Sequence, residues 1–211
     1  AGVTLPIMVM NPDPSASELI IKYNLEPEIF SFSSFEKFTE VASKHGLINY
    51  PVHIKIDSGM HRLGFMPEDV GSLGERIKTT ECIKIISVFS HLAASEDPAL
   101  DHFSHRQVAV FLKAVTQIYE ATGYTFLRHI LNSSGITRFP QYQFEMVRPG
   151  IGMYGVGHFN GLKLRTAGRF KTRISQVKRI LAGEPVGYGC ADASDYERII
   201  AILPVGYADG L

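Results

Sequence analysis

Two patterns alternate along this chain, and their alternation limits the folds that it can adopt. Short apolar runs rich in β-branched residues are followed by amphipathic stretches of helical periodicity over most of the sequence. The expected strands are residues 5–10 (buried), 28–32, 52–56, 83–89, 126–131 and 146–147, and the expected helices are residues 15–23, 34–45, 68–78 and 101–122. Strand alternating with helix predicts a parallel sheet with right-handed crossovers.

Two α/β architectures are compatible with this alternation. Six strands over about 150 residues match most of an eight-stranded barrel, whose usual size is about 250 residues. A doubly wound open sheet is the alternative. The first expected strand is followed by the turn-forming run Asn11-Pro12-Asp13-Pro14 and not by a glycine-rich dinucleotide-binding turn. The partial (β/α)8 barrel is therefore favoured.

The pattern changes after Gly155. Residues 170–180, 185–189 and 198–205 are expected to be strands joined by short turns, with no helix between them. This is the pattern of an all-β domain that begins after a linker around residues 157–168. The sequence thus predicts an α/β class fold with a partial barrel over residues 1–160, followed by the N-terminal part of a β-domain over residues 161–211.

Composition excludes several classes of partner. The 21 basic residues are balanced by 21 acidic residues, so no surplus charge is available to neutralise nucleic acid. Cys82 and Cys190 are too few for a disulfide framework or a zinc knuckle, and two reduced thiols fit a cytosolic protein. No apolar run approaches the roughly 18 residues of a membrane span. We therefore expect a cytoplasmic protein with no metal site, no nucleic-acid partner and no membrane partner.

Polar clusters follow four of the expected strands. They are KIDSGMHRLG at residues 55–64, SHLA at 90–93, NSSG at 132–135 and VRPGIGMYG at 147–155. In an α/β barrel the reactive groups lie at the carboxyl ends of the strands, so these clusters are expected to share one site.

Residue chemistry alone leaves alternatives open at this site. Lys55, at a buried strand end beside an aspartate, is a candidate for a Schiff base. Ser133 precedes a glycine where a hydroxyl and backbone donors can bind a phosphate, and Asn132 either joins it or caps the turn. His91 is a base, a ligand or a packed core histidine.

Taken together with VGYG at residues 186–189 and PVGYADG at 204–210, these four segments resemble the alanine racemase family. The resemblance extends from residue 5 to the end of the chain. Each motif is weak by itself, but six in order and at matching spacing are specific. The resemblance implies a pyridoxal-phosphate enzyme, an isomerase that interconverts L-alanine and D-alanine through a cofactor aldimine and supplies D-alanine for cell-wall peptidoglycan.

The resemblance also implies roles for the barrel residues. Arg148 faces the pyridine nitrogen of the cofactor, and its guanidinium keeps its protons, which disfavours transamination relative to racemisation. By the same resemblance, Ser133 and the backbone of Gly150 and Ile151 hold the cofactor phosphate, and Asn132 either joins them or caps the turn.

Lys55 has a different implied role from the one that its chemistry suggests. In the family this lysine supports the site and can be carbamylated, and its negative charge then orients Arg62, which contacts the cofactor. An unmodified Lys55 paired with a carboxylate stays open as the alternative. The Schiff-base lysine of the family precedes Ala-Tyr-Gly near the N-terminus, and no such run occurs in this chain. We therefore expect a fragment that lacks the segments at both ends of the family and is inactive alone.

The acid–base group that the resemblance implies within this chain is Tyr188, assisted by His91, which is hydrogen-bonded to Arg148. Racemisation needs two proton-transfer groups on opposite faces of the substrate, here the lysine and the tyrosine. In the family this tyrosine reaches the cofactor of the partner in a head-to-tail homodimer, and Tyr207 lines the entrance to the shared site. A racemase of another amino acid, such as serine, and a non-catalytic barrel that binds pyridoxal phosphate are the alternatives.

Overall fold

The computed structural model describes residues 2–157, 161 and 163–210, and it divides into two compact units, Ala1–Arg165 and Thr166–Leu211. The boundary predicted between residues 160 and 161 falls beside residue 160, which lies outside the described residues, as do parts of the expected linker at 157–168. That boundary therefore stays a prediction. Each unit is described by itself below.

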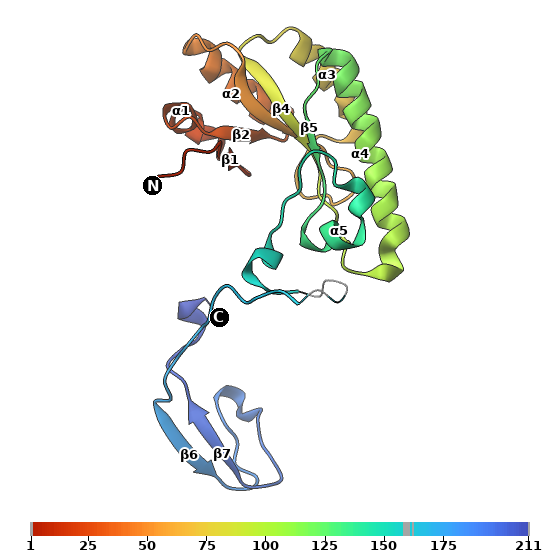
Figure 1. Ribbon diagram of the computed structural model, residues 1–211. Helices are drawn as coiled ribbons and strands as arrows, with labels where there is room; N and C mark the ends of the chain where they lie inside the picture. Colours follow the sequence, from red (N-terminus) through yellow and green to blue (C-terminus); the bar gives the residue numbers. More distant parts are fainter. Residues whose placement is uncertain (1, 158–160, 162, 211) are drawn as a thin grey trace. The chain divides into compact units, whose positions relative to one another are not determined.

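The first unit is built on a parallel sheet with consecutive strand order (Figure 1). Its strands are β1 (Met8–Val9), β2 (Glu26–Ile29), β3 (Tyr50–Lys55), β4 (Ile83–Phe89) and β5 (Leu127–His129). A doubly wound sheet reverses its strand order at a switch point. This sheet advances in one direction only, as a barrel does, so the predicted α/β fold class with a partial barrel is confirmed.

The helices of this unit are α1 (Ser17–Lys22), α2 (Phe32–Lys44), α3 (Val70–Lys78), α4 (Asp101–Thr122) and α5 (Ser133–Arg138). Local sequence explains where the longer ones begin and end. Ser31 and Ser34 form a reciprocal capping box at the start of α2. The helix α4 ends at Gly123, whose φ of 70° favours glycine. The helices α1 to α4 join successive strands and share one core with the sheet, as expected for right-handed crossovers on one side of it.

The two faces of the sheet differ in chemistry. The face toward the helices is apolar, with Val52, Ile54 and Ile85 almost completely buried against Leu73 and Phe111. Burying side chains of this size stabilises the fold by roughly 1.5–3 kcal/mol each. Buried polar side chains also occur on the strands, and they are Glu28, His53, Lys55, Ser87 and His129. Their contacts, described below, place them together on the other face of the sheet.

Several expected strands of this unit differ in extent, and one is absent. The strand expected at residues 28–32 is Glu26–Ile29, because α2 begins at Phe32, and the strand expected at residues 126–131 is only Leu127–His129. The strand expected at residues 5–10 is only Met8–Val9, and Leu5 is 76% exposed, because β1 pairs with β2 alone and has little covering it. Residues 146–147 form no strand. They belong to a loop that is attached to the sheet where the backbone N–H of Arg148 donates to the carbonyl of Leu131 over 3.0 Å.

The second unit contains one antiparallel hairpin, β6 (Gln176–Ile180) and β7 (Arg198–Ile202). The strand expected at residues 170–180 is only Gln176–Ile180, and the strand expected at residues 198–205 ends at Ile202. The strand expected at residues 185–189 is wrong. Only an isolated bridge joins Val186 to Asp192, and a short 3-10 turn, Tyr188–Cys190, follows it. Glycines break this segment, since Gly187 adopts a φ of 78° that does not fit a regular strand.

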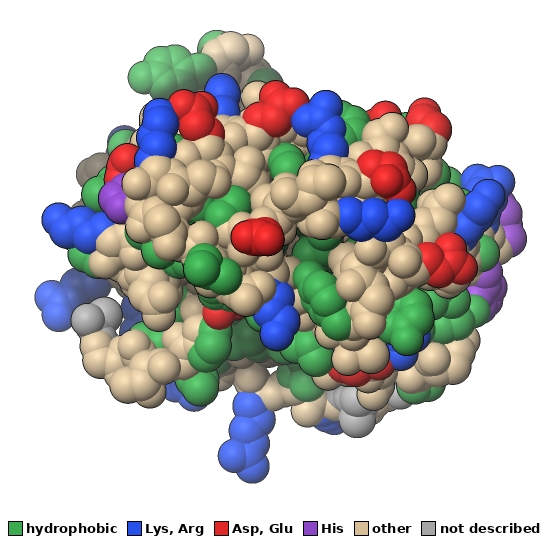
Figure 2. Space-filling model, turned by 90° about the horizontal axis from the view of Figure 1, so that it is seen from above, with side chains coloured by type: hydrophobic (Ala, Val, Ile, Leu, Met, Phe, Trp, Pro, Cys, Tyr) green, Lys and Arg blue, Asp and Glu red, His purple; other side chains and the backbone are tan. Residues whose placement is uncertain are grey.

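Across the described residues, no helix combines the length and apolar character needed to cross a bilayer. Acidic and basic side chains are interspersed on the face shown in Figure 2. That mixture agrees with the zero net charge of the sequence.

Candidate active site

The candidate site lies at the carboxyl ends of β3, β4 and β5. Because these strands are parallel, Lys55, His91 and Ser133 arrive at the same edge of the sheet. The loops that follow the strands determine how each side chain is presented.

The loop after β3 is held by Asp57, a buried carboxylate. Its Oδ1 accepts hydrogen bonds from the backbone N–H groups of Gly59 (2.9 Å) and His61 (3.0 Å). Gly64 closes the loop with a φ of 131°, and a Cβ there would lie 2.4 Å from the backbone nitrogen of Asp57. Arg62 is presented on the exposed side of this loop. A tight turn therefore carries the arginine of this segment.

Lys55 is paired with a carboxylate that sequence analysis missed. Its Nζ lies 2.9 Å from Oε1 of Glu28, and both side chains are buried. The two side chains form an ion pair, but the angles at Oε1 of Glu28 are not those of a hydrogen bond. The other oxygen of Glu28 accepts from the backbone N–H of Asn11 over 2.6 Å. This contact corresponds to the alternative that the sequence left open, in which an unmodified Lys55 is paired with a carboxylate.

Arg148 is hydrogen-bonded to groups at the carboxyl ends of β4 and β5. Its Nη1 donates to Nδ1 of His129 and, over 3.3 Å, to the carbonyl of His129. Its Nη2 donates to the carbonyl of Ser90 (2.5 Å) and to Nδ1 of His91 (3.2 Å). The guanidinium also lies 5.1 Å from the centre of the Phe89 ring. Burial lowers the pKa of Arg148 to about 10, which leaves it protonated at neutral pH.

The contacts of Arg148 fix the protonation of two histidines. A guanidinium only donates, so Nδ1 of His91 and Nδ1 of His129 must both accept. Burial, followed by the positive charges of Arg148, Arg62 and Lys55, lowers the pKa of His91 to about 4. Burial, followed by Arg148 and His53, lowers the pKa of His129 to about 2. Both rings are therefore neutral at neutral pH, with the proton on Nε2.

Ser133, which follows β5, accepts hydrogen bonds from two backbone N–H groups. Its Oγ accepts from the N–H of Gly150 (2.8 Å) and from the N–H of Gly152 (3.1 Å). These bonds use both lone pairs of the hydroxyl, so its own hydrogen must be donated elsewhere. No acceptor for that hydrogen is found within the described part of the chain. Of the two backbone positions predicted, Gly150 takes part, Ile151 is 60% exposed, and Gly152 was missed.

Asn132 is engaged as a cap. Its Oδ1 accepts from the N–H of Gly135 (2.9 Å) and from the hydroxyl of Ser95 (2.7 Å), while its Nδ2 donates to the carbonyl of Leu92 (3.3 Å). This is the capping alternative that the sequence left open. A phosphate contact from Asn132 stays a prediction.

Tyr188 and Tyr207 belong to the second unit. Both lie on short 3-10 turns, Tyr188–Cys190 and Tyr207–Asp209, and both side chains are fully exposed. Neither ring is therefore packed in a core of the described residues. Within the first unit, the structure thus brings Arg148 to His91 and Ser133 to Gly150.

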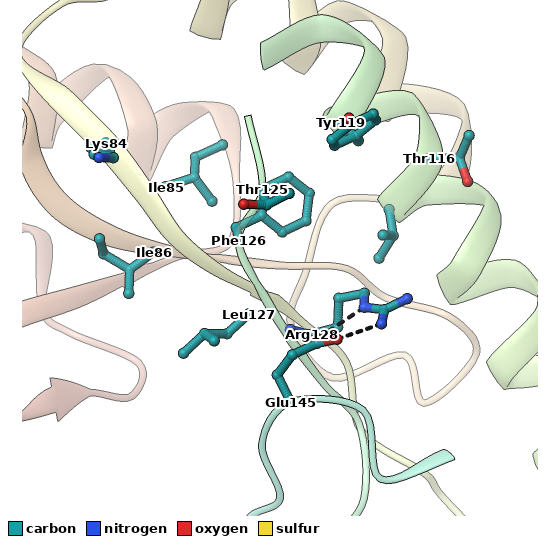
Figure 3. A pocket seen from close by; sticks show the side chains of 11 residues that line it. Lys84, Ile85, Ile86, Thr116, Tyr119, Thr125, Phe126, Leu127, Arg128 and Glu145 are labelled. Atoms are coloured by element: carbon teal, nitrogen blue, oxygen red, sulfur yellow. Dashed lines mark hydrogen bonds and ion pairs between the residues drawn. The ribbon is translucent and has the colours of Figure 1, made fainter. Parts of the chain in front are cut away.

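A hollow of about 610 Å³ lies away from these groups (Figure 3). It is bordered by β4, β5 and α4 and is lined by apolar side chains such as Ile86, Phe126 and Leu127. Arg128 and Glu145 form an ion pair at one side of it. The strand-end groups described above do not line this hollow, so it is not the candidate site.

Comparisons with known proteins were made for the whole chain. Residues 1–158 match the family "Alanine racemase, N-terminal domain", and residues 167–211 match "Alanine racemase, C-terminal domain". The alanine racemase 1 of Clostridium acetobutylicum is 35% identical over 218 residues, which cover 100% of this chain and 56% of that protein.

Two solved structures agree with these matches. The alanine racemase of Clostridium difficile 630 has a TM-score of 0.80 at 30% identity, over 99% of this chain and 56% of that one. An alanine racemase of Bartonella henselae, described with covalently bound pyridoxal phosphate, has a TM-score of 0.79 at 28% identity, over 100% of this chain and 57% of that one. The chain thus spans little more than half the length of the relatives that it matches.

Proposed function

The chain belongs to the alanine racemase family, and we propose that it forms part of an enzyme that interconverts L-alanine and D-alanine with pyridoxal phosphate. One observation carries this proposal. At one edge of the sheet, a guanidinium held between two neutral imidazoles lies on the same loop as the glycines that converge on Ser133. When bound, the cofactor supplies the electron sink that makes the α-proton of an amino acid removable.

The phosphate of the cofactor fits the cluster around Ser133. Its hydroxyl keeps a hydrogen to donate, because both of its lone pairs already accept from Gly150 and Gly152. A phosphate oxygen is a strong acceptor for such a hydroxyl and for the neighbouring backbone donors. We propose that Ser133, Gly150 and the adjoining backbone of Ile151 hold the phosphate, while Asn132 supports them as the cap of α5.

Arg148 is proposed to donate to the ring nitrogen of the cofactor. Four of its five N–H groups are directed at His129, Ser90 and His91, and among the described residues Nε–H has no recorded acceptor. A guanidinium at a ring nitrogen donates without transferring its proton, so that nitrogen remains an acceptor. This limits electron withdrawal and favours return of a proton to the substrate carbon over transamination. Arg62, exposed on the loop after β3, is proposed as a second cofactor contact.

Tyr188 is proposed to move a proton at the α-carbon of the substrate. His91 is fixed with its proton on Nε2, and an N–H donor beside a phenolic oxygen stabilises the deprotonated form of that phenol. The exposed position of Tyr188 on a turn suits a residue that completes a site in a second copy of the chain, as a head-to-tail homodimer requires. Tyr207, equally exposed, is proposed to line the entrance to that site.

The proposal is tested with a full-length protein that contains this chain, reconstituted with pyridoxal phosphate and assayed for racemisation of L-alanine by loss of optical activity, whereas the 211-residue chain alone is expected to be inactive. We expect turnover with alanine and much less with serine. The Tyr188→Phe variant should lose about 10²–10⁴-fold in kcat, the usual contribution of a general acid–base group, while it still binds the cofactor. A Tyr196→Phe variant is the control, since Tyr196 is an exposed tyrosine of the same unit outside the proposed site.

Each other outcome decides between the alternatives. Turnover of serine in preference to alanine would make the protein a racemase of another amino acid. Binding of the cofactor without turnover of either substrate would leave a non-catalytic barrel. Full activity of Tyr188→Phe would remove the tyrosine from the mechanism. Because the product would be D-alanine, we further propose that it serves peptidoglycan synthesis, which complementation of a D-alanine auxotroph would test.

A further inference from the structure

A line of hydrogen bonds crosses the polar face of the sheet below Arg148. Nε2 of His129 lies 2.9 Å from Oγ of Ser87, and the same Oγ lies 2.7 Å from Nδ1 of His53. Nε2 of His53 then lies 2.8 Å from Oε2 of Glu26. These residues come from β5, β4, β3 and β2, and they are buried or nearly so. With Arg148 they form a continuous line from a guanidinium to a carboxylate.

A β-bulge is what puts Ser87 into this line. In the register of β3 with β4, Val52 pairs with Ile85 but the next residue, His53, pairs with Ser87, so Ile86 is an extra residue in β4. An extra residue reverses the side-chain alternation of a strand. As a result Ile85 faces the helices, whereas Ser87 faces the two imidazoles.

The two ends of the line determine its polarity. Arg148 can only donate, so Nδ1 of His129 accepts and the proton of this neutral ring is on Nε2. Nε2 of His129 must then donate to Ser87, whose hydroxyl donates to Nδ1 of His53. The remaining proton of His53 is on Nε2 and is donated to Glu26, which as a carboxylate only accepts. Every donor therefore meets an acceptor.

The opposite assignment of donors and acceptors is excluded by the contact between Arg148 and His129. It would set an N–H of Arg148 against an N–H at Nδ1 of His129. Protonation of His53 also fails, because Ser87 would then accept from both rings and lose the acceptor for its own hydrogen. Burial lowers the pKa of His53 as it does that of His129, which is the direction that this arrangement requires.

We propose that Glu26, His53 and Ser87 are positioning residues which, through His129, hold the guanidinium of Arg148 in one orientation and keep both imidazoles in the Nε2–H form. Buried networks of this kind are rigid when every member is satisfied. The use of Arg148 in catalysis rests on the proposed function, but the line itself can be tested without any activity.

The first test is NMR of the protein labelled with ¹⁵N-histidine, in which long-range ¹H–¹⁵N couplings distinguish the two neutral tautomers and the charged ring. His129 and His53 should both be neutral Nε2–H tautomers at pH 7. Their signals are assigned with His129→Gln and His53→Gln, and His105→Gln serves as the matched control because His105 is bonded to Tyr142 outside the line. An Nδ1–H tautomer or a charged ring at either position overturns the proposal.

The second test separates positioning from folding. Glu26→Gln keeps an acceptor for Nε2–H of His53 and should preserve both tautomers, whereas Glu26→Leu removes the acceptor and should disturb the tautomer of His53. Ser87→Ala interrupts the line, so in the cofactor-loaded protein it should raise the ratio of transamination to racemisation, by up to about a hundredfold for a misplaced catalytic contact. An unchanged ratio in a folded Ser87→Ala protein overturns the positioning role.

The two proposals fail in different ways. If the tautomers are as expected but the protein racemises no amino acid, the line stands and the proposed function fails. If racemisation is found and the tautomers differ, the function stands and the line fails.

Discussion

Lys55 shows how far a single partner can set the chemistry of a residue. Carbamylation joins the free-base amine of lysine to carbon dioxide and releases a proton, so it needs an unprotonated nitrogen. The carboxylate of Glu28, 2.9 Å from Nζ and fully buried, forms an ion pair with this side chain instead. The negative charge that a carbamate would bring to this position is already supplied by Glu28.

We therefore predict that Lys55 is unmodified. ¹³C NMR of the protein in ¹³C-bicarbonate should show no carbamate signal, whereas Glu28→Gln should gain a signal that depends on bicarbonate. Lys55→Arg in the Glu28→Gln background is the control, because a guanidinium forms no such adduct. A carbamate signal from the unaltered protein that disappears in Lys55→Arg would contradict this prediction.

His129 links the stability of the first unit to pH. Its pKa is about 2 in the folded chain against 6.5 for the free side chain. Below pH 6.5 the unfolded chain binds a proton that the folded chain does not, so this histidine stabilises the fold above pH 6.5. The stabilisation is lost as the pH falls toward 2, by up to about 1.4 kcal/mol per pH unit.

Urea unfolding at pH 7.5, 6.5, 5.5 and 4.5 measures this dependence. As the pH is lowered, the free energy of unfolding should fall less steeply for His129→Gln than for the unaltered protein. The comparison is between slopes, because the substitution also removes contacts and lowers stability at every pH. Equal slopes for the two proteins would show that His129 does not resist protonation.

Polar clusters at or just after the ends of strands were predictable, whereas single polar residues within strands were not. Lys55, His91, Ser133 and Arg148 were singled out because polar clusters after apolar runs mark the carboxyl ends of barrel strands. Glu28 was missed, as were His53, Ser87 and His129. The available signal was their spacing of two residues, as in Glu26 and Glu28 or His53 and Lys55, which places polar groups on one face of each strand.

Among the elements, β5 has a protected edge. The backbone N–H of Arg128 donates to Oε2 of Glu145 over 2.9 Å, and the Arg128 side chain pairs with the same carboxylate. A side chain thereby occupies a donor that an exposed edge strand would otherwise offer to another chain.

We predict that Glu145→Ala speeds hydrogen exchange of the Arg128 amide by about fivefold, the equivalent of one hydrogen bond of about 1 kcal/mol. Global stability should change by no more than about 1 kcal/mol, because the ion pair is partly exposed. Glu145→Gln, which retains an acceptor, should exchange more slowly than Glu145→Ala. Equal exchange in all three proteins would mean that Glu145 does not cover this edge.

The loop after β3 depends on Gly64. We expect Gly64→Ala to cost at least about 1–3 kcal/mol in the free energy of unfolding, because the backbone has a φ of 131° and the new Cβ would meet the backbone of Asp57. Gly71→Ala is the matched control within α3, where a Cβ meets nothing within 4 Å and φ is ordinary. That substitution should be neutral or stabilising by up to about 1 kcal/mol. Equal costs at both positions would contradict the role of Gly64.

Elements with long periodic patterns were predicted closely and short ones were not. The strand at residues 83–89 and the helix at residues 101–122 have the bounds expected of them. The strand expected at residues 146–147 was too short to carry an alternation, and glycines interrupt residues 185–189. Local apolar content alone cannot distinguish such segments from loops that are tied to a sheet by one hydrogen bond.

At the scale of the whole molecule, the two units differ in how well they bury apolar surface. In the first, one continuous core joins the sheet to its helices. In the second, apolar side chains on the hairpin remain exposed, including Val177 at 59% and Ile199 at 74%. An isolated two-stranded hairpin is at best marginally stable in water.

We predict that, in this polypeptide alone, residues 166–210 exchange their amide hydrogens and are cleaved by proteases as an unfolded segment, while the core of residues 2–157 is protected. Hydrogen exchange read by mass spectrometry measures both units at once. Protection of β6 and β7 comparable to that of β3 and β4 would contradict this prediction. The all-β nature of the segment was predictable from its turns, but its lack of a core was visible only in the structure.

The extra residue in β4 has a consequence for anyone who alters this protein. Ile86 acts as a phase shift in the side-chain alternation, so pairing Ile86 regularly with His53 would turn every later side chain of the strand to the opposite face. A hydroxyl would be exchanged for a hydrocarbon between two imidazoles, although the composition would barely change. Sequence comparisons that align this strand without a gap, or designs that regularise it, would therefore misassign its inward-facing positions.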